Sequence, residues 1–186
     1  PKNENVKAAI LNAAERLLCK QPEVSLADIA KEAAVSKGTL FYHYRSKTEI
    51  YLDISERYWA KLSNDLLAWV DDRSKVTTPT RLARYTMLRG VFDQSGPLRL
   101  HLFVEAISRD RSDNAVRDAL IGQYAQFKNI LKTRIMERIP GADGERLAWL
   151  LLVMVDGLTV QHSLQNPEID IDGFIEWMAV QFESEA

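Results

Sequence analysis

Residues 25–47 (SLADIAKEAAVSKGTLFYHYRSK) constrain the fold more than any other part of the chain, because they predict two short helices joined by a tight turn. Ser25 is placed to cap the first helix, and Asp28 follows three positions later in the spacing of a capping box. The tripeptide Ala-Val-Ser then breaks the helical pattern. Its last residue, Ser36, is placed to cap a second helix that extends to about Tyr44. This arrangement predicts a helix-turn-helix.

The rest of the chain also has helical periodicity, and the whole sequence predicts nine helices and no strand. Polar residues at 71–79 (DDRSKVTTP) and a charged run at 109–113 separate helices, and Pro140 with Gly141 ends the seventh. We therefore predict an all-α fold. The first predicted helix has about 15 residues and contains 6–18. The two short helices follow it, and then a long helix that contains 50–69. The remaining helices lie at about 80–95, 98–108, 115–139, 144–164 and 171–183.

The net charge of −2 hides a local concentration of positive charge. Residues 34–47 carry three cations and no carboxylate, and the cations are Lys37, Arg45 and Lys47. The chain after residue 57 is acidic, with 15 Lys and Arg against 18 Asp and Glu. A small basic face on an acidic body can bind phosphates locally without general attraction to polyanions.

The composition also excludes several kinds of site. Cys19 is the only cysteine, which excludes an internal disulfide and a cysteine metal cluster. His101 and His162 lie isolated in apolar helices, and we expect core or pocket-lining histidines rather than metal ligands. The longest strictly apolar run, residues 147–155, is too short to cross a bilayer, and the N-terminus has no signal-peptide pattern. We therefore expect a cytoplasmic protein with no membrane partner, metal or cofactor.

The second helix of the predicted helix-turn-helix begins with residues suited to DNA bases. In such motifs the first residues of the second helix face base edges in the major groove. Lys37 can donate to guanine O6 and N7, and Thr39 offers a hydroxyl and a methyl group. Gly38 allows close approach of the backbone.

Other polar residues around this helix are suited to the phosphates. Tyr42 and His43 follow on its outward face, and Lys47 stands in the first turn of the next helix. Ser25 and the amides that follow it offer another phosphate contact. Together with Ser36, which caps the second helix, these residues complete the predicted DNA-binding set.

The segment VSLADIAKEAAVSKGTLFYHYRSKTEI resembles the DNA-binding signature of the TetR family of bacterial transcriptional regulators. The likeness covers about the first 55 residues, and the Asp156-Gly157-Leu158 step is similar to the penultimate helix of many members. The resemblance implies a homodimeric repressor with a DNA-binding domain at 1–48 and a ligand-binding and dimerisation domain at 49–186. Its implied partners are a palindromic double-stranded operator and a small, largely apolar effector.

Two other function classes are alternatives to a DNA-binding regulator. An enzyme lacks support, because the chain has no His/Glu metal pair, glycine-rich phosphate loop or serine elbow, and no catalytic residue is predicted. A helical module whose helix-turn-helix binds protein would have no salt-dependent affinity for duplex DNA. Within the regulator class, activation remains an alternative to repression.

The chain departs from the family pattern at two positions. Phe41 stands where the family often has tyrosine, so a phosphate contact from that hydroxyl is absent, and we expect Phe41 and Tyr44 in the core of the small domain. Ala34 stands where the turn often has glycine. A left-handed conformation at this alanine would cost about 1 kcal/mol or more.

The last two helices are apolar over more than one stripe, so each must bury more than one face. One face can pack within the subunit and another against a partner, as in a four-helix bundle, although full burial within a monomer fits the composition equally well. The resemblance implies dimerisation through these two helices. The predicted interface residues are Leu151, Val155, Leu158, His162, Phe174, Trp177 and Met178.

An inducible regulator would also need a ligand pocket, and aromatic and methionine residues scattered through the later helices are its candidates, although such residues belong more often to a core. Glu105 and Asp156 lie in apolar stretches, where each can bind a ligand, pair with an arginine or face solvent. The predicted pocket residues are Tyr58, Leu62, Tyr85, Leu88, Phe92, Phe103, Glu105, Phe127, Trp149 and Met154.

Overall fold

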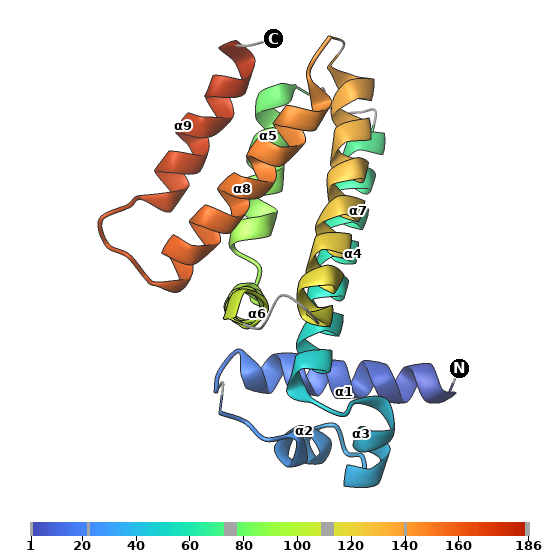
Figure 1. The fold of residues 1–186 in the computed structure, drawn as a ribbon. Coiled ribbons are helices and arrows are strands. Elements are labelled where there is room, and N and C mark those ends of the chain that lie inside the picture. Colours follow the sequence, from blue (N-terminus) through green and yellow to red (C-terminus); the bar gives the residue numbers. More distant parts are fainter. Residues whose placement is uncertain (1, 22, 73–77, 109–113, 140, 185–186) are drawn as a thin grey trace. The chain divides into compact units, whose positions relative to one another are not determined.

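A computed structural model describes residues 2–21, 23–72, 78–108, 114–139 and 141–184. In these ranges the chain forms nine α-helices and no strand, which confirms the predicted all-α fold (Figure 1). The predicted charged run at 109–113, Pro140 and part of the connector at 71–79 lie outside the described residues. The helices are α1 (Lys2–Leu18), α2 (Leu26–Glu32), α3 (Lys37–His43), α4 (Lys47–Asp71), α5 (Pro79–Val91), α6 (Gly96–Ser108), α7 (Ala115–Arg138), α8 (Gly144–Ser163) and α9 (Ile171–Ser184).

The chain divides into two compact units. The N-terminal unit comprises Pro1–Tyr58 and Pro97–Leu120, and the C-terminal unit comprises Trp59–Gly96 and Ile121–Ala186. Helix α4 therefore contributes to both units, and nearly all of α6 belongs to the N-terminal one. Among the described residues, no helix is both long enough and apolar enough to cross a membrane.

The N-terminal unit is built on one apolar core. Ile10 of α1, Ile29 of α2, Leu40 of α3 and Ile50 of α4 are completely buried in it. Apolar residues of α6, such as Leu102, are buried in the same cluster. The short helices α2 and α3 are thus held mainly by tertiary packing, since helices of seven residues are not stable alone.

The turn between α2 and α3 has the capping groups that the sequence predicts. Asp28 N donates to Ser25 Oγ and Ser25 N donates to the Asp28 carboxylate, so the capping box is confirmed. Ser36 Oγ accepts from Thr39 N at 3.0 Å and caps α3. Between the helices, Ala34 has φ 54, which is the left-handed conformation expected from its position in the turn.

Ala34→Gly is expected to raise the free energy of unfolding by about 0.5–1 kcal/mol, because glycine adopts a positive φ without the steric cost of a Cβ. Urea denaturation followed by circular dichroism measures the change. Ala33→Gly is the matched control, since Ala33 has φ −75 and the change there should lower stability. Equal destabilisation by both variants would contradict the predicted strain at Ala34.

The C-terminal unit has α5 packed against α8 and α9, and these three helices lie side by side in Figure 1. Met87 and Val91 of α5 are completely buried. Two threonines are buried nearby, and each hydroxyl donates to the carbonyl four residues earlier: Thr86 to Leu82 and Thr159 to Val155. These bonds satisfy polar groups that would otherwise be costly inside a core.

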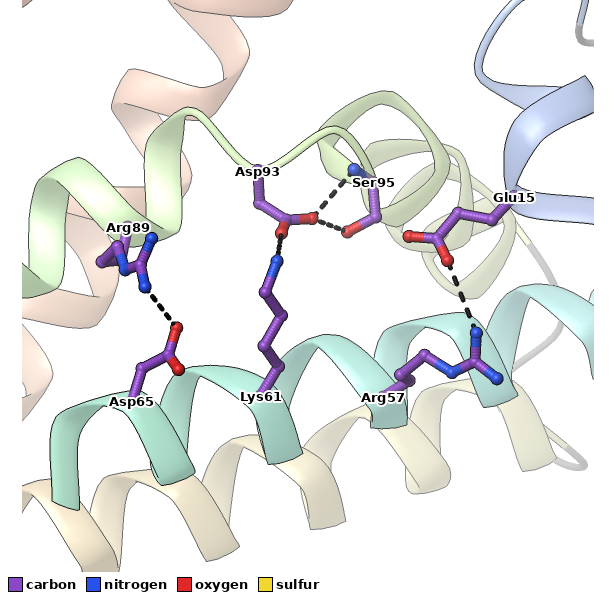
Figure 2. A network of polar contacts seen from close by, with 7 residues as sticks. All are labelled: Glu15, Arg57, Lys61, Asp65, Arg89, Asp93 and Ser95. Carbon is purple, nitrogen blue, oxygen red and sulfur yellow. Dashed lines mark hydrogen bonds and ion pairs between the residues drawn. The ribbon is translucent and has the colours of Figure 1, made fainter. Parts of the chain in front are cut away.

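Polar contacts also join the C-terminal unit's part of α4 to α5 and the loop after it. Arg89 donates to the Asp65 carboxylate at 2.8 Å, and Lys61 pairs with Asp93 at 3.4 Å (Figure 2). Asp93 also accepts from the backbone N and the hydroxyl of Ser95. Because the cationic partners are exposed, these pairs orient helices more than they stabilise them.

Candidate nucleic-acid interface

Helix α3 presents one exposed face and buries the opposite one. Leu40 is completely buried, and Tyr44, the C-cap of α3, is 2% exposed. The exposed residues occupy positions i, i+1, i+4 and i+5, which lie together on a helix. We call them the α3 face, and they are Lys37, Gly38, Phe41 and Tyr42.

Phe41 is 52% exposed, so the prediction that it lies in the core of the small domain is wrong. The inner stripe of this short helix consists of Leu40 and Tyr44, and the residue after Leu40 is rotated by about 100° away from it. Tyr44, the other residue predicted in the core, is buried as expected.

Tyr44 fixes the end of α3 to its neighbours. Its hydroxyl donates to the Asp53 carboxylate at 2.8 Å, and Lys7 pairs with the same carboxylate at 2.7 Å. Burial and then the hydrogen bond to Asp53 raise the pKa of Tyr44, so the phenol stays a neutral donor. This contact joins α1, α3 and α4 and holds the α3 face in a defined orientation within the N-terminal unit.

The polar residues predicted to contact DNA, on and beside the α3 face, differ in how exposed their side chains are. Tyr42 is 78% exposed, and its ring stands edge-on to that of His43, with ring centroids 5.1 Å apart. Lys37 is exposed, whereas His43 and Lys47 are half-buried. Lys37 and Tyr42 are therefore the most accessible donors to DNA among the predicted residues of α3.

Three predicted DNA-binding residues have internal partners. The hydroxyls of Ser36 and Thr39 lie 2.7 Å apart, so the Thr39 hydroxyl is engaged by the cap of its own helix. Ser25 Oγ donates to the Asp28 carboxylate at 2.5 Å. This hydrogen bond is the main cause of the lowered pKa of Asp28, which stays ionised at neutral pH. An anion next to Ser25 opposes a phosphate there, so capping is the role its contacts support.

The predicted dimer-interface residues separate into two groups. Leu151, Val155 and Leu158 are 1%, 1% and 4% exposed, so they have almost no surface left for a partner, and the prediction for these three is wrong. Phe174 and Met178 are half-buried, and His162 and Trp177 are exposed. The exposed apolar residues of these two helices, which we call the α8–α9 face, are Trp149, Leu150, Val153, Val160, Trp177 and Val180.

The predicted pocket residues belong to both units. Tyr58, Phe103 and Glu105 lie in the N-terminal unit, and the rest lie in the C-terminal one. Trp149 is exposed on α8 one turn before Val153, and its place in a ligand pocket stays a prediction. Phe92 is also exposed, with its ring edge-on to that of His162. Those that are buried or half-buried are Tyr58, Leu62, Tyr85, Leu88, Phe103, Glu105, Phe127 and Met154.

An aromatic cluster in the C-terminal unit includes residues that the sequence did not single out for a pocket. Trp59 of α4 contacts Tyr124 and Phe127 of α7, with ring centroids 5.1 and 4.9 Å apart. The Tyr124 hydroxyl donates to the Asp156 carboxylate at 2.5 Å. The spacing of Tyr124 and Phe127 by three residues on one helix was the signal available in the sequence.

Two family models match the chain, one in its N-terminal part and one in its C-terminal part. The model described as bacterial regulatory proteins, tetR family, matches residues 10–54, which include α2 and α3. The model described as BetI-type transcriptional repressor, C-terminal, matches residues 80–185. The two matches together cover most of the chain.

Curated relatives extend over nearly the whole sequence. The HTH-type transcriptional regulator BetI of Rhizobium meliloti is 23% identical over 171 residues, which are 91% of this chain and 83% of the relative. The HTH-type transcriptional regulator TtgR of Pseudomonas putida is 24% identical over 188 residues, covering 93% of this chain and 87% of the relative.

Solved structures show the same fold at lower identity. A putative TetR-family regulator from Mesorhizobium loti has a TM-score of 0.75 at 15% identity, with 99% of this chain and 98% of that chain covered. FadR from Bacillus subtilis, solved in complex with stearoyl-CoA, has a TM-score of 0.67 at 15% identity, with 94% and 96% covered. With the helix-turn-helix and its exposed α3 face, these matches show that the chain belongs to the TetR family and is a DNA-binding transcriptional regulator rather than an enzyme.

Proposed function

We propose that this protein is a repressor that binds a palindromic operator as a homodimer and is released by a small, largely apolar effector. The single observation that carries the DNA-binding part is the α3 face. Lys37 and Tyr42 are exposed there, in a segment with three cations and no carboxylate. Lys37 donates to base edges, and Tyr42, His43 and Lys47 contact phosphates on either side.

The α8–α9 face supports the homodimer. It combines Trp149, Val153 and Trp177, all more than 40% exposed, on the two helices of the C-terminal unit that pack with α5. Exposed apolar residues that include tryptophan are typical of a protein–protein interface. Two copies of one chain that meet through the same surface form a closed dimer with twofold symmetry, which matches a palindromic site.

The contacts between α6 and the start of α4 support coupling of effector binding to DNA binding. Thr48 Oγ1 donates to the Glu105 carboxylate at 2.8 Å, and the rings of Tyr51 and His101 stand edge-on, with centroids 5.1 Å apart. Both contacts join α6 to the first turns of α4, directly after α3. A ligand that displaces α6 would change the orientation of α3. The difference between its affinities for the DNA-binding state and the released state would supply a coupling free energy of about 1–3 kcal/mol.

The aromatic and aliphatic character of the buried and half-buried pocket candidates supports an apolar effector. Leu62 and Phe127 of the C-terminal unit are buried and offer mainly apolar surface. A fatty acyl ligand is an example of this class, since FadR of Bacillus subtilis was solved with stearoyl-CoA.

A reporter gene placed behind an operator selected from random duplexes tests repression and release in cells. We expect the protein to lower expression and a subset of amphipathic compounds to restore it. The same compounds should weaken operator binding by the purified protein about 5- to 150-fold. Raised expression in the presence of the protein would show activation. A compound that binds tightly and leaves operator affinity unchanged would exclude the coupling.

A further inference from the structure

We propose that Phe41 contacts the C5-methyl group of thymine and thereby helps to select the operator sequence, an inference that rests on the proposed function. The sequence places Phe41 in the core, but the structure leaves its side chain about half exposed on the α3 face. Lys37, the candidate for base contact, stands one helical turn earlier on that same face.

Phe41 is neither part of the apolar core of the N-terminal unit nor among the partly buried residues that pack against that core. Leu40 and Tyr44 fill the core on the inner side of α3, and Tyr44 makes the polar contact to Asp53. Single exposed apolar residues are common, so exposure alone does not indicate a contact. The position of Phe41 on the α3 face, which the proposed function turns toward DNA, does indicate a contact. Among the four residues of that face, Phe41 is the one with a large, wholly apolar side chain.

Gly38 gives independent support for close approach of this face to DNA. Glycine is less favourable than alanine in a helix, by about 1 kcal/mol in the interior, and Gly38 is the second residue of α3. A Cβ at Gly38 would meet only Ser36 Oγ, at 3.8 Å, which is ordinary contact, and its φ is not in the left-handed region. The folded chain thus has room for alanine at this position. Close approach of the α3 backbone to a DNA groove is a reason to keep glycine.

The chemistry of the major groove then identifies what Phe41 can contact. Guanine, cytosine and adenine present hydrogen-bonding atoms there, whereas thymine alone adds an apolar methyl group. A phenylalanine ring gains by covering that methyl group and gains nothing from a phosphate. Lys37 and Phe41 are separated by about 6 Å along the helix axis, because four residues rise by 1.5 Å each. The thymine should therefore lie within about two base pairs of the guanine that Lys37 contacts, since base pairs are about 3.4 Å apart.

Replacing thymine by deoxyuridine tests this contact, because the exchange removes only the C5-methyl group. Each thymine of the selected operator is exchanged in turn, in both half-sites together. For the unmodified protein, we expect the exchange to weaken binding at one thymine position of the half-site. The expected loss is about fourfold per half-site and therefore about 15-fold for the two half-sites together. For Phe41→Ala, the same exchange should change affinity by less than twofold, because the group that senses the methyl is gone.

Tyr42→Ala is the matched control, since it removes a more exposed aromatic ring from the same face. It should weaken binding to all duplexes and keep the full thymine effect. Phe41→Leu, which stays apolar, should keep part of that effect, and thermal unfolding of each variant checks that the fold is intact.

The proposal is overturned if no replacement of thymine by deoxyuridine weakens binding. It is also overturned if the replacement lowers the affinity of Phe41→Ala and of the unmodified protein by the same factor. Failure of the unmodified protein to bind any duplex is a different result, because it overturns the proposed function itself. Retained thymine sensitivity in Phe41→Ala, with loss in Tyr42→Ala, would assign the contact to Tyr42.

Discussion

Val153→Glu is expected to convert the proposed homodimer to a monomer and to weaken operator binding by at least about 100-fold. Val153 is 62% exposed on the α8–α9 face, so glutamate there leaves the folded monomer nearly unchanged. In a dimer the twofold axis would place two carboxylates in an apolar interface, where unpaired charges are costly. A monomer then loses the avidity of two linked half-sites, which is worth a factor of about 10²–10⁴.

Analytical ultracentrifugation measures the mass in solution, and a duplex-binding titration measures the affinity. Ile107→Glu is the matched control, because Ile107 is 83% exposed on α6 and lies outside the α8–α9 face. It should remain dimeric and bind the operator normally. A dimeric Val153→Glu protein with unchanged operator affinity would exclude this face as the interface, and a monomeric Ile107→Glu protein would place the interface on α6.

Leu40→Ala is expected to destabilise the N-terminal unit by about 2–5 kcal/mol, because Leu40 is completely buried and alanine leaves a cavity beneath α3. Local unfolding of α3 should then become at least about 30-fold more frequent, since 1.36 kcal/mol corresponds to a factor of ten. Hydrogen exchange of the α2 and α3 amides is the suitable measurement, because it reports stability region by region.

Phe41→Ala provides the comparison at the adjacent position. Because the Phe41 side chain is about half exposed, its loss should cost less than about 1 kcal/mol and leave the exchange of α3 nearly unchanged. Similar acceleration by both substitutions would place Phe41 in the core after all. It would then remove the basis for a thymine contact.

Much of the secondary structure could be predicted because local signals determine helix ends. Ser25 and Ser36 each accept a hydrogen bond from the third amide of the helix that they cap, and this needs only residue type and spacing. The positive φ of Ala34 was likewise predictable from its place in a tight turn. Each of these features depends on a few neighbouring residues, so the sequence contains the relevant information.

The side on which a residue faces was harder to predict where a helix is short or apolar all round. Helix α3 has seven residues, so a stripe of Leu40 alone does not determine whether Phe41 lies inside. Helix α8 has apolar residues on several sides, and only packing against α5 shows that Leu151 and Val155 face inward while Val153 faces outward. The grouping of α6 with the N-terminal unit depends on contacts distant in sequence, such as that of Glu105 with Thr48.

Selection of bound duplexes from a random pool tests the central claim most directly, namely that the α3 faces of two protomers recognise a specific operator. The purified protein is incubated with the pool at low salt, and bound duplexes are recovered and sequenced. We predict a palindromic consensus whose half-sites are centred about one helical turn apart, with affinity that falls steeply as salt rises. Lys37→Ala should lose enrichment at one position of each half-site. No enrichment at low salt would contradict the assignment of Lys37 and Tyr42 to DNA binding.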